Sequence, residues 1–148
     1  MSNPYLVKHQ FTLGVVTPYS IGDVAEGEIT LTDLGVNGAA LHSIALMNRE
    51  ALTFTLNLHL FQGALTGGTV TDNAAFVIAD ADDAIYITTI QLATWYDIAS
   101  KKVAVQNSIG LTLPSTLSGD IFLVPEFRTA YTPTDADGLR LIMGILPG

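Results

Sequence analysis

Strict alternation of apolar and polar residues in one segment constrains the fold of this chain most. Between residues 52 and 60 every second side chain is apolar, and the side chains between them are polar. The apolar set is Leu52, Phe54, Leu56, Leu58 and Leu60. Successive side chains of a strand point to opposite faces, so this period of two predicts a strand with one face in a core. No amphipathic segment of helical length accompanies it, which favours a β-protein.

Further short apolar runs, rich in β-branched and aromatic residues, predict more strands separated by Gly, Asn and Asp turns. The expected strands cover residues 11–15, 28–32, 41–47, 85–92, 103–105, 109–113, 121–127 and 139–146. Short strands at this spacing predict an all-β fold, a jelly-roll-like sandwich or barrel of about eight strands. Pro125 has no N–H to donate, so we expect its strand at a sheet edge or beside a bulge.

Length and local pattern predict one domain. A chain of 148 residues buries about 70% of its unfolded surface on folding, which is enough for a stable hydrophobic core without disulfides or metal ions. Cysteine is absent, so no disulfide holds the fold. Residues 1–10 have the weakest pattern and are expected to form an N-terminal arm, with residues 11–148 as a single β-domain.

The connector at residues 72–84 is expected to contain short helical turns. Asp72 ahead of residues 73–76, and Asp80 with Asp83, carry the short oxygen side chains that cap helix starts. Asp80, Asp82 and Asp83 also suit a hard cation such as calcium. The glycine and glutamate of a calcium loop are missing, so capping is the favoured interpretation. Residues 135–138, Asp-Ala-Asp-Gly, likewise predict a tight turn before the last strand. We expect no metal and no other cofactor.

The charge balance disfavours a nucleic-acid partner. Six Lys and Arg against fourteen Asp and Glu leave a net charge of −8, whereas phosphate binding needs clustered cations. Only 14% of residues are charged, against about 25% in typical domains, so we expect another chain to cover part of the apolar surface. No apolar run reaches the roughly 20 residues of a membrane helix, and the N-terminus lacks a signal-like pattern. The expectation is a soluble protein made in the cytoplasm, without a membrane partner.

Familiar catalytic spacings are missing from the sequence. It has no G-x-S-x-G motif, and His9, His42 and His59 share no metal-ligand spacing, so the histidines are interpreted as surface or interface residues. Trp95-Tyr96 could stack on a sugar, although a tryptophan in a core corner or subunit interface is the commoner case. Paired carboxylates for glycoside hydrolysis converge only in space and stay open as an alternative. The expectation is a protein that is not an enzyme.

Four stretches taken together resemble the head decoration, or cement, proteins of tailed bacteriophages, a family of minor capsid proteins. They are residues 17–24, residues 41–46 with 56–61, residues 71–76 with 80–82, and residues 131–139 running into the closing strand. Thr71-Asp72-Asn73-Ala74-Ala75-Phe76 is the most specific of them. Met47-Asn48 and Ile121-Phe122 depart from the pattern of the family, which leaves the subfamily open.

The resemblance implies a jelly-roll subunit, forming a homotrimer, on the outer surface of an icosahedral capsid. Such a subunit binds the major capsid protein and stabilises the virion by bridging neighbouring capsid subunits. Arg128 and Tyr131 are the expected partner-binding residues, because they follow an edge-like strand in a polar loop. The alternative is a glycan-binding sandwich module or head-fibre component that uses Trp95 and Tyr96.

Overall fold

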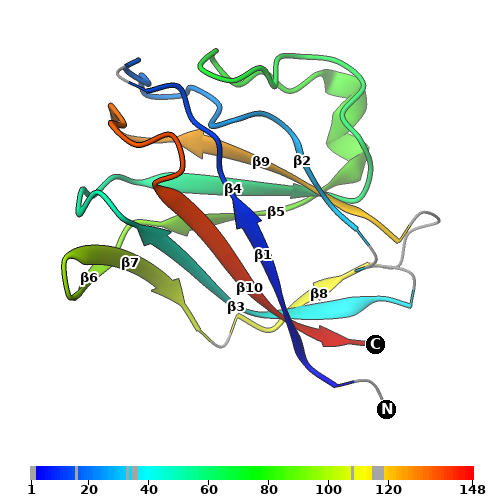
Figure 1. The fold of residues 1–148 in the computed structure, drawn as a ribbon. Helices are drawn as coiled ribbons and strands as arrows, with labels where there is room; N and C mark the ends of the chain where they lie inside the picture. Colours follow the sequence, from blue (N-terminus) through cyan, green and yellow to red (C-terminus); the bar gives the residue numbers. More distant parts are fainter. Residues whose placement is uncertain (1–2, 16, 33, 35–36, 108, 115–118) are drawn as a thin grey trace.

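Two antiparallel β-sheets packed face to face form the protein (Figure 1). The computed structural model describes residues 3–15, 17–32, 34, 37–107, 109–114 and 119–148. In this part of the chain, ten strands and one short 3-10 helix are present. The prediction of an all-β sandwich is therefore confirmed, with more strands than the expected eight.

The larger sheet has six strands in the order β1-β10-β3-β7-β6, with β8 also pairing with β3. Its strands are β1 (Tyr5–Gln10), β3 (Ala39–Asn48), β6 (Trp95–Ile98), β7 (Lys101–Gln106), β8 (Leu111–Leu113) and β10 (Leu139–Pro147). The smaller sheet has four strands in the order β2-β9-β4-β5. Its strands are β2 (Ile29–Leu31), β4 (Leu56–Phe61), β5 (Tyr86–Leu92) and β9 (Ile121–Phe127).

The strand pairs are nested along the chain. β1 pairs with β10, β2 with β9, β3 with β7 and β8, and β4 with β5. This is the connectivity of one long hairpin rolled into two sheets, the arrangement of a jelly roll. It places the two ends of the chain on the same sheet, as Figure 1 shows for the blue β1 and the red β10.

The main core lies between the sheets and is built by the alternation seen in the sequence. Phe54, Leu56, Leu58 and Leu60 are buried in it. The ladder of β4 begins at Leu56, however, and Leu52 is 44% exposed, so the predicted strand was too long at its start. The strand expected at residues 11–15 is not formed. Phe11 and Leu13 are nevertheless buried, in a segment without regular secondary structure.

Residues Tyr5–Gln10 form an edge strand, not an arm. All six residues of β1 are in register with β10, from Tyr5 opposite Ile145 to Gln10 opposite Arg140. Val7 packs against the core. The prediction that residues 1–10 stand apart from the β-domain is therefore wrong for β1. The sequence pattern did not show this strand, because its alternation is short and is interrupted by Lys8 and His9.

The connector between β4 and β5 covers part of the outer face of the smaller sheet (Figure 1, green). A second apolar cluster forms beneath it, around Val24, Phe61 and Val124, with Leu65, Val70, Phe76, Ile85 and Phe122 against them. The helix η1 (Asp80–Ile85) confirms one of the two expected helical turns, but its cap is Ala79 and no side chain bonds there. Residues 73–76 form a turn without a helix.

Pro125 lies in an interior strand, so the sheet-edge alternative of the prediction is wrong. The other alternative, an irregular ladder, holds on one side, because Ile29 lies opposite Leu123 but Val24 lies opposite Glu126, which shifts the register by two residues beside Pro125. β9 has β2 on one side and β4 on the other. Ala25 N donates to Pro125 O at 3.0 Å. The nitrogen of Pro125, which carries no hydrogen, therefore also faces Ala25. The carbonyl of Ala25 does not need a hydrogen bond from residue 125, because Ala25 O already accepts from Gly27 N at 2.8 Å. That bond closes a tight turn at Glu26, whose φ is 72°.

Candidate functional site

Asp72, within the stretch that carries the family resemblance, joins three segments through one oxygen. Its Oδ1 accepts from the hydroxyl of Tyr19 at 2.8 Å and from the backbone N–H of Glu26 at 2.7 Å. Burial, followed by the hydrogen bond and charge of Asp72, raises the pKa of Tyr19 above its usual range. Asp72 is therefore structural as expected, but it holds distant segments instead of capping the turn that follows it.

Asp82 holds two parts of the connector together through its carboxylate. Its carboxylate is 2% exposed and accepts from Thr66 Oγ1 at 2.8 Å, from Thr66 N at 3.1 Å and from Gly67 N at 3.2 Å. These hydrogen bonds, that from the Thr66 side chain first, lower the pKa of Asp82. No set of three His, Asp or Glu side chains among the described residues is arranged to hold a metal ion.

Tyr131 belongs to the core, not to a partner-binding loop. It is 5% exposed, its ring centroid lies 4.5 Å from that of Phe54, and its hydroxyl donates to Glu50 Oε2 at 2.8 Å. Burial, then Glu50, raises the pKa of Tyr131 above its usual range. Glu50 also accepts from Thr134 N at 2.5 Å. Tyr131 therefore fixes this loop from within, and its assignment as a surface anchor is corrected.

The other residues predicted near this loop behave differently. Arg128 follows β9 and is exposed, and its guanidinium donates to Glu126 Oε2 at 3.3 Å. Its role in binding a partner stays a prediction. The tight turn before β10 is confirmed, because Asp137 N donates to Asp135 Oδ1 at 2.9 Å.

Trp95 and Tyr96 do not form a joint aromatic platform. Neighbouring residues of a strand point to opposite faces. Trp95 packs inward at 5.0 Å from Phe54 and donates Nε1–H to Phe54 O at 2.7 Å, while Tyr96 is 58% exposed. The structure therefore places Trp95 in a core corner.

A hydroxyl, an imidazole and a carboxylate meet on the outer face of the smaller sheet. His59 Nδ1 lies 2.7 Å from Thr89 Oγ1, and His59 Nε2 lies 2.9 Å from Glu126 Oε1. The three residues come from β4, β5 and β9. Sequence reasoning missed this set and could only place His59 on the polar face of its strand, because the spacing of the three residues has no motif.

The network extends beyond these three residues to a fourth side chain. Thr89 Oγ1 also bonds to the Tyr86 hydroxyl at 2.7 Å, so the hydroxyl already has two partners. The set is best described as a polar cross-strand network.

An open hollow of about 370 Å³ lies beside this network. Its lining comprises His59, Phe61, Phe76, Ile78, Asp83, Tyr86 and Thr89. The ring of Phe76 stacks on His59 with centroids 5.1 Å apart. Aromatic and aliphatic side chains thus form the walls, and the exposed carboxylate of Asp83 lies at the rim. We call this surface, together with Asp80 from the same helix η1, the acidic hollow.

The outer face of the larger sheet is the second uncovered surface. The ladder register aligns outward side chains in rows: Leu6, Gly144 and Ser43; then Lys8, Ile142, Ala45 and Val105; then Gln10, Arg140, Met47, Val103 and Tyr96. Lys101 and Arg49 line a depression together with Met47, Arg140 and Ile142. Four of the six Lys and Arg residues of the chain thus surround an apolar centre, which we call the basic face.

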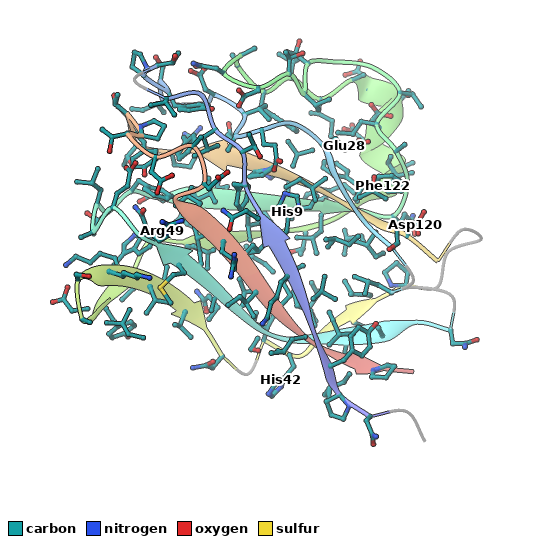
Figure 2. All side chains as sticks on the ribbon, in the orientation of Figure 1. His9, Glu28, His42, Arg49, Asp120 and Phe122 are labelled. Atoms are coloured by element: carbon teal, nitrogen blue, oxygen red, sulfur yellow. The ribbon has the colours of Figure 1, made fainter. Side chains whose placement is uncertain are left out.

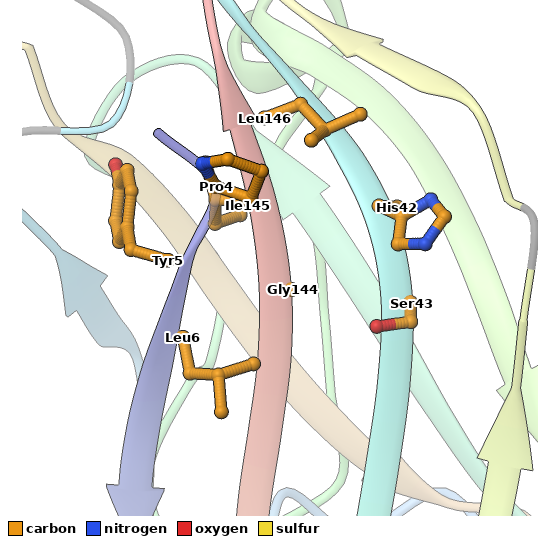
Figure 3. Close-up of a pocket in the computed structure, with 8 residues that line it drawn as sticks. All are labelled: Pro4, Tyr5, Leu6, His42, Ser43, Gly144, Ile145 and Leu146. Atoms are coloured by element: carbon orange, nitrogen blue, oxygen red, sulfur yellow. The ribbon is translucent and has the colours of Figure 1, made fainter. Parts of the chain in front are cut away.

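A groove at one end of the basic face is made by a glycine (Figure 3). Leu6, which is 61% exposed, and Ser43 flank Gly144 in adjacent strands. A Cβ on Gly144 would lie 2.5 Å from Ser43 Oγ. His42 is exposed nearby and points away from the sandwich (Figure 2). The remaining histidine, His9, contacts Glu26 at 2.6 Å.

Comparison with known proteins supplies no family. No family model matches the chain, and no curated protein matches it. Among solved structures, it aligns with a chain from the "Structure of infectious bursal disease virus Gx strain", at 12% identity and a TM-score of 0.15. The alignment covers 98% of this chain and 40% of that chain. A TM-score this low does not indicate a shared fold.

No helix in the described ranges is both long enough and apolar enough to cross a membrane.

Proposed function

We propose that this protein is a non-catalytic virion subunit that decorates a phage capsid. As a homotrimer on the outer capsid surface, it bridges neighbouring copies of the major capsid protein and stabilises the shell. The observation that carries the proposal is the basic face. An apolar, cation-ringed sheet face left open on a chain with 14% charged residues is typical of a surface that a second chain covers, which supports an oligomeric subunit.

Stabilisation follows from binding alone. A ligand that binds only the assembled shell shifts the equilibrium towards assembly by mass action. Rigid β-sandwich subunits suit this role, because few side chains need ordering when preformed surfaces dock. The sequence resemblance at residues 71–82 supports the virion setting.

The test is to add purified protein to capsids that lack it and to image them by electron microscopy. We expect new density on the outer shell and a longer capsid lifetime on heating. Arg128→Ala should weaken attachment, while Lys102→Ala, which removes a cation paired with Asp97 at 2.5 Å, serves as the matched control. Shells that gain neither density nor lifetime would refute the proposal.

The glycan-binding alternative loses its supporting geometry, because Trp95 and Tyr96 face opposite sides of β6 and Trp95 is packed on Phe54. We therefore do not propose it.

A further inference from the structure

We propose that the two uncovered surfaces bind each other between copies, so that the basic face of one copy covers the acidic hollow of the next. This inference names the contact inside the homotrimer and rests on the proposed function. It concerns which surfaces of this chain recognise a second copy, and it does not depend on the residues that attach to a capsid.

Charge on the basic face determines what can cover it. No Asp or Glu occupies an outward position in the rows of the larger sheet, and Lys8 and Lys101 have no ion-pair or hydrogen-bond partner within the described residues. Two basic faces placed against each other would bring like charges together, which disfavours a symmetric contact. The partner surface is therefore acidic.

The same chain carries such a surface on its other sheet. The carboxylates of Asp80 and Asp83 are exposed, and in the described part of the chain neither is held by an ion pair or a side-chain hydrogen bond.

The walls of the hollow suit a basic side chain. Tyr86 is 46% exposed there, and Phe76 presents an aromatic ring beside Asp83. A Lys or Arg side chain lays its apolar stem along such walls, places its charge near aromatic faces and pairs with the rim carboxylate. The apolar residues around Met47 and Ile142 would cover Ile78, which lines the hollow, and the neighbouring Val77; both are exposed.

A contact between two different surfaces is heterologous. It closes into a ring when successive copies are suitably rotated, and otherwise extends into a filament. A closed ring of three copies is the form that the proposed homotrimer requires.

The experiment uses the full chain and charge reversal on each surface. The acid-side variant is Asp80→Lys with Asp83→Lys, and the base-side variant is Lys8→Glu with Lys101→Glu. Sedimentation should show the wild type as an oligomer and each variant as a monomer of about 15.7 kDa at micromolar concentration. A 1:1 mixture should associate again into dimers or even-numbered assemblies, because the unchanged basic face of the acid-side variant meets the unchanged acidic hollow of the base-side variant. It should not restore a ring of three, since an odd ring cannot alternate the two variants. Asp97→Lys, at an exposed position of β6 that belongs to neither surface, is the control that should stay oligomeric.

Circular dichroism of each variant shows whether it is folded, and so separates loss of the contact from loss of the fold. If a double variant unfolds, the two single substitutions are tested instead. A monomeric wild type, oligomeric variants, or monomeric variants that fail to reassociate would overturn the inference. Capsid attachment is scored separately on the same proteins. Self-association without attachment contradicts the proposed function alone. Attachment by a monomeric wild type contradicts this inference and the homotrimer, but leaves capsid decoration standing. Mass that grows with concentration supports the contact but contradicts the homotrimer.

Discussion

The carboxylate of Asp72 stabilises several loops at once, because it accepts hydrogen bonds from two of them. Replacing it with Ala leaves the buried hydroxyl of Tyr19 and the amide of Glu26 without their acceptor. We expect Asp72→Ala to lower the free energy of unfolding by about 1–3 kcal/mol, the cost of unsatisfied buried donors. Urea denaturation measures the change. Asp72→Asn keeps an oxygen acceptor and should retain most of the stability. An unchanged midpoint for Asp72→Ala would contradict this role.

Asp82 makes stability depend on acidity. Its pKa in the folded protein lies below the unfolded value of 3.8, so the unfolded state binds more protons in that range. The stabilisation is therefore present above pH 3.8 and is lost as the pH falls through the folded pKa. The stability difference between wild type and Asp82→Asn should be greatest near neutral pH and shrink on acidification. Denaturation midpoints across the acid range test this, with Asp80→Asn, an exposed acid of the same turn, as control. A difference that stays constant would contradict it.

At the scale of elements, β1 protects the edge of the larger sheet. Deleting residues 1–10 removes the only partner of β10 on that side and leaves β10 as an open edge. We expect a loss of at least about 2 kcal/mol from lost ladder bonds and Val7 packing, together with aggregation through the exposed edge. Thermal melts and light scattering report both. Deleting only residues 1–4 is the control. A fully stable, monodisperse 1–10 deletion would show that β1 acts as an arm.

The connector is held by a close backbone approach at Gly68. Its φ is +72°, and an added Cβ would lie 2.0 Å from Val77 O. Gly68→Ala should cost more than about 1 kcal/mol, because the backbone must shift as well as tolerate a left-handed conformation. Gly110→Ala is a matched control, since its φ is +62° and nothing lies within 4 Å. Thermal unfolding of the two variants separates the clash from the backbone conformation, and equal losses would contradict the clash.

For the whole molecule, the nested pairing predicts slow folding. The larger sheet joins β1 at the start of the chain to β10 at its end. Loop closure over such separations precedes the contacts that stabilise it, so refolding should take milliseconds to seconds. The single tryptophan, Trp95, packs on Phe54 and is a suitable fluorescence probe for stopped-flow refolding. A phase complete within microseconds would contradict this expectation.

Local pattern was sufficient for most of the elements. The alternation around Leu56 to Leu60 and the β-branched run at β5 predicted strands that the structure contains, because period and propensity are properties of neighbouring residues. Strands with weak or mixed patterns were missed, namely β1 and β6. The helical turn at residues 80–85 was recognised, but its capping was not, because Asp82 accepts its bonds from Thr66 and Gly67, across the connector.

By itself the sequence determined the class of the fold, the main core of alternating residues, the acidic net charge and the shortage of charged groups. Only the tertiary structure decided which side chains meet. His59, Thr89 and Glu126 are brought together by the register of three strands, and the cations Lys8, Lys101 and Arg140 come to share one face through the order of β1, β10, β3 and β7. The physical reason is that register and strand order arise from contacts between residues far apart in the chain, which no local pattern contains.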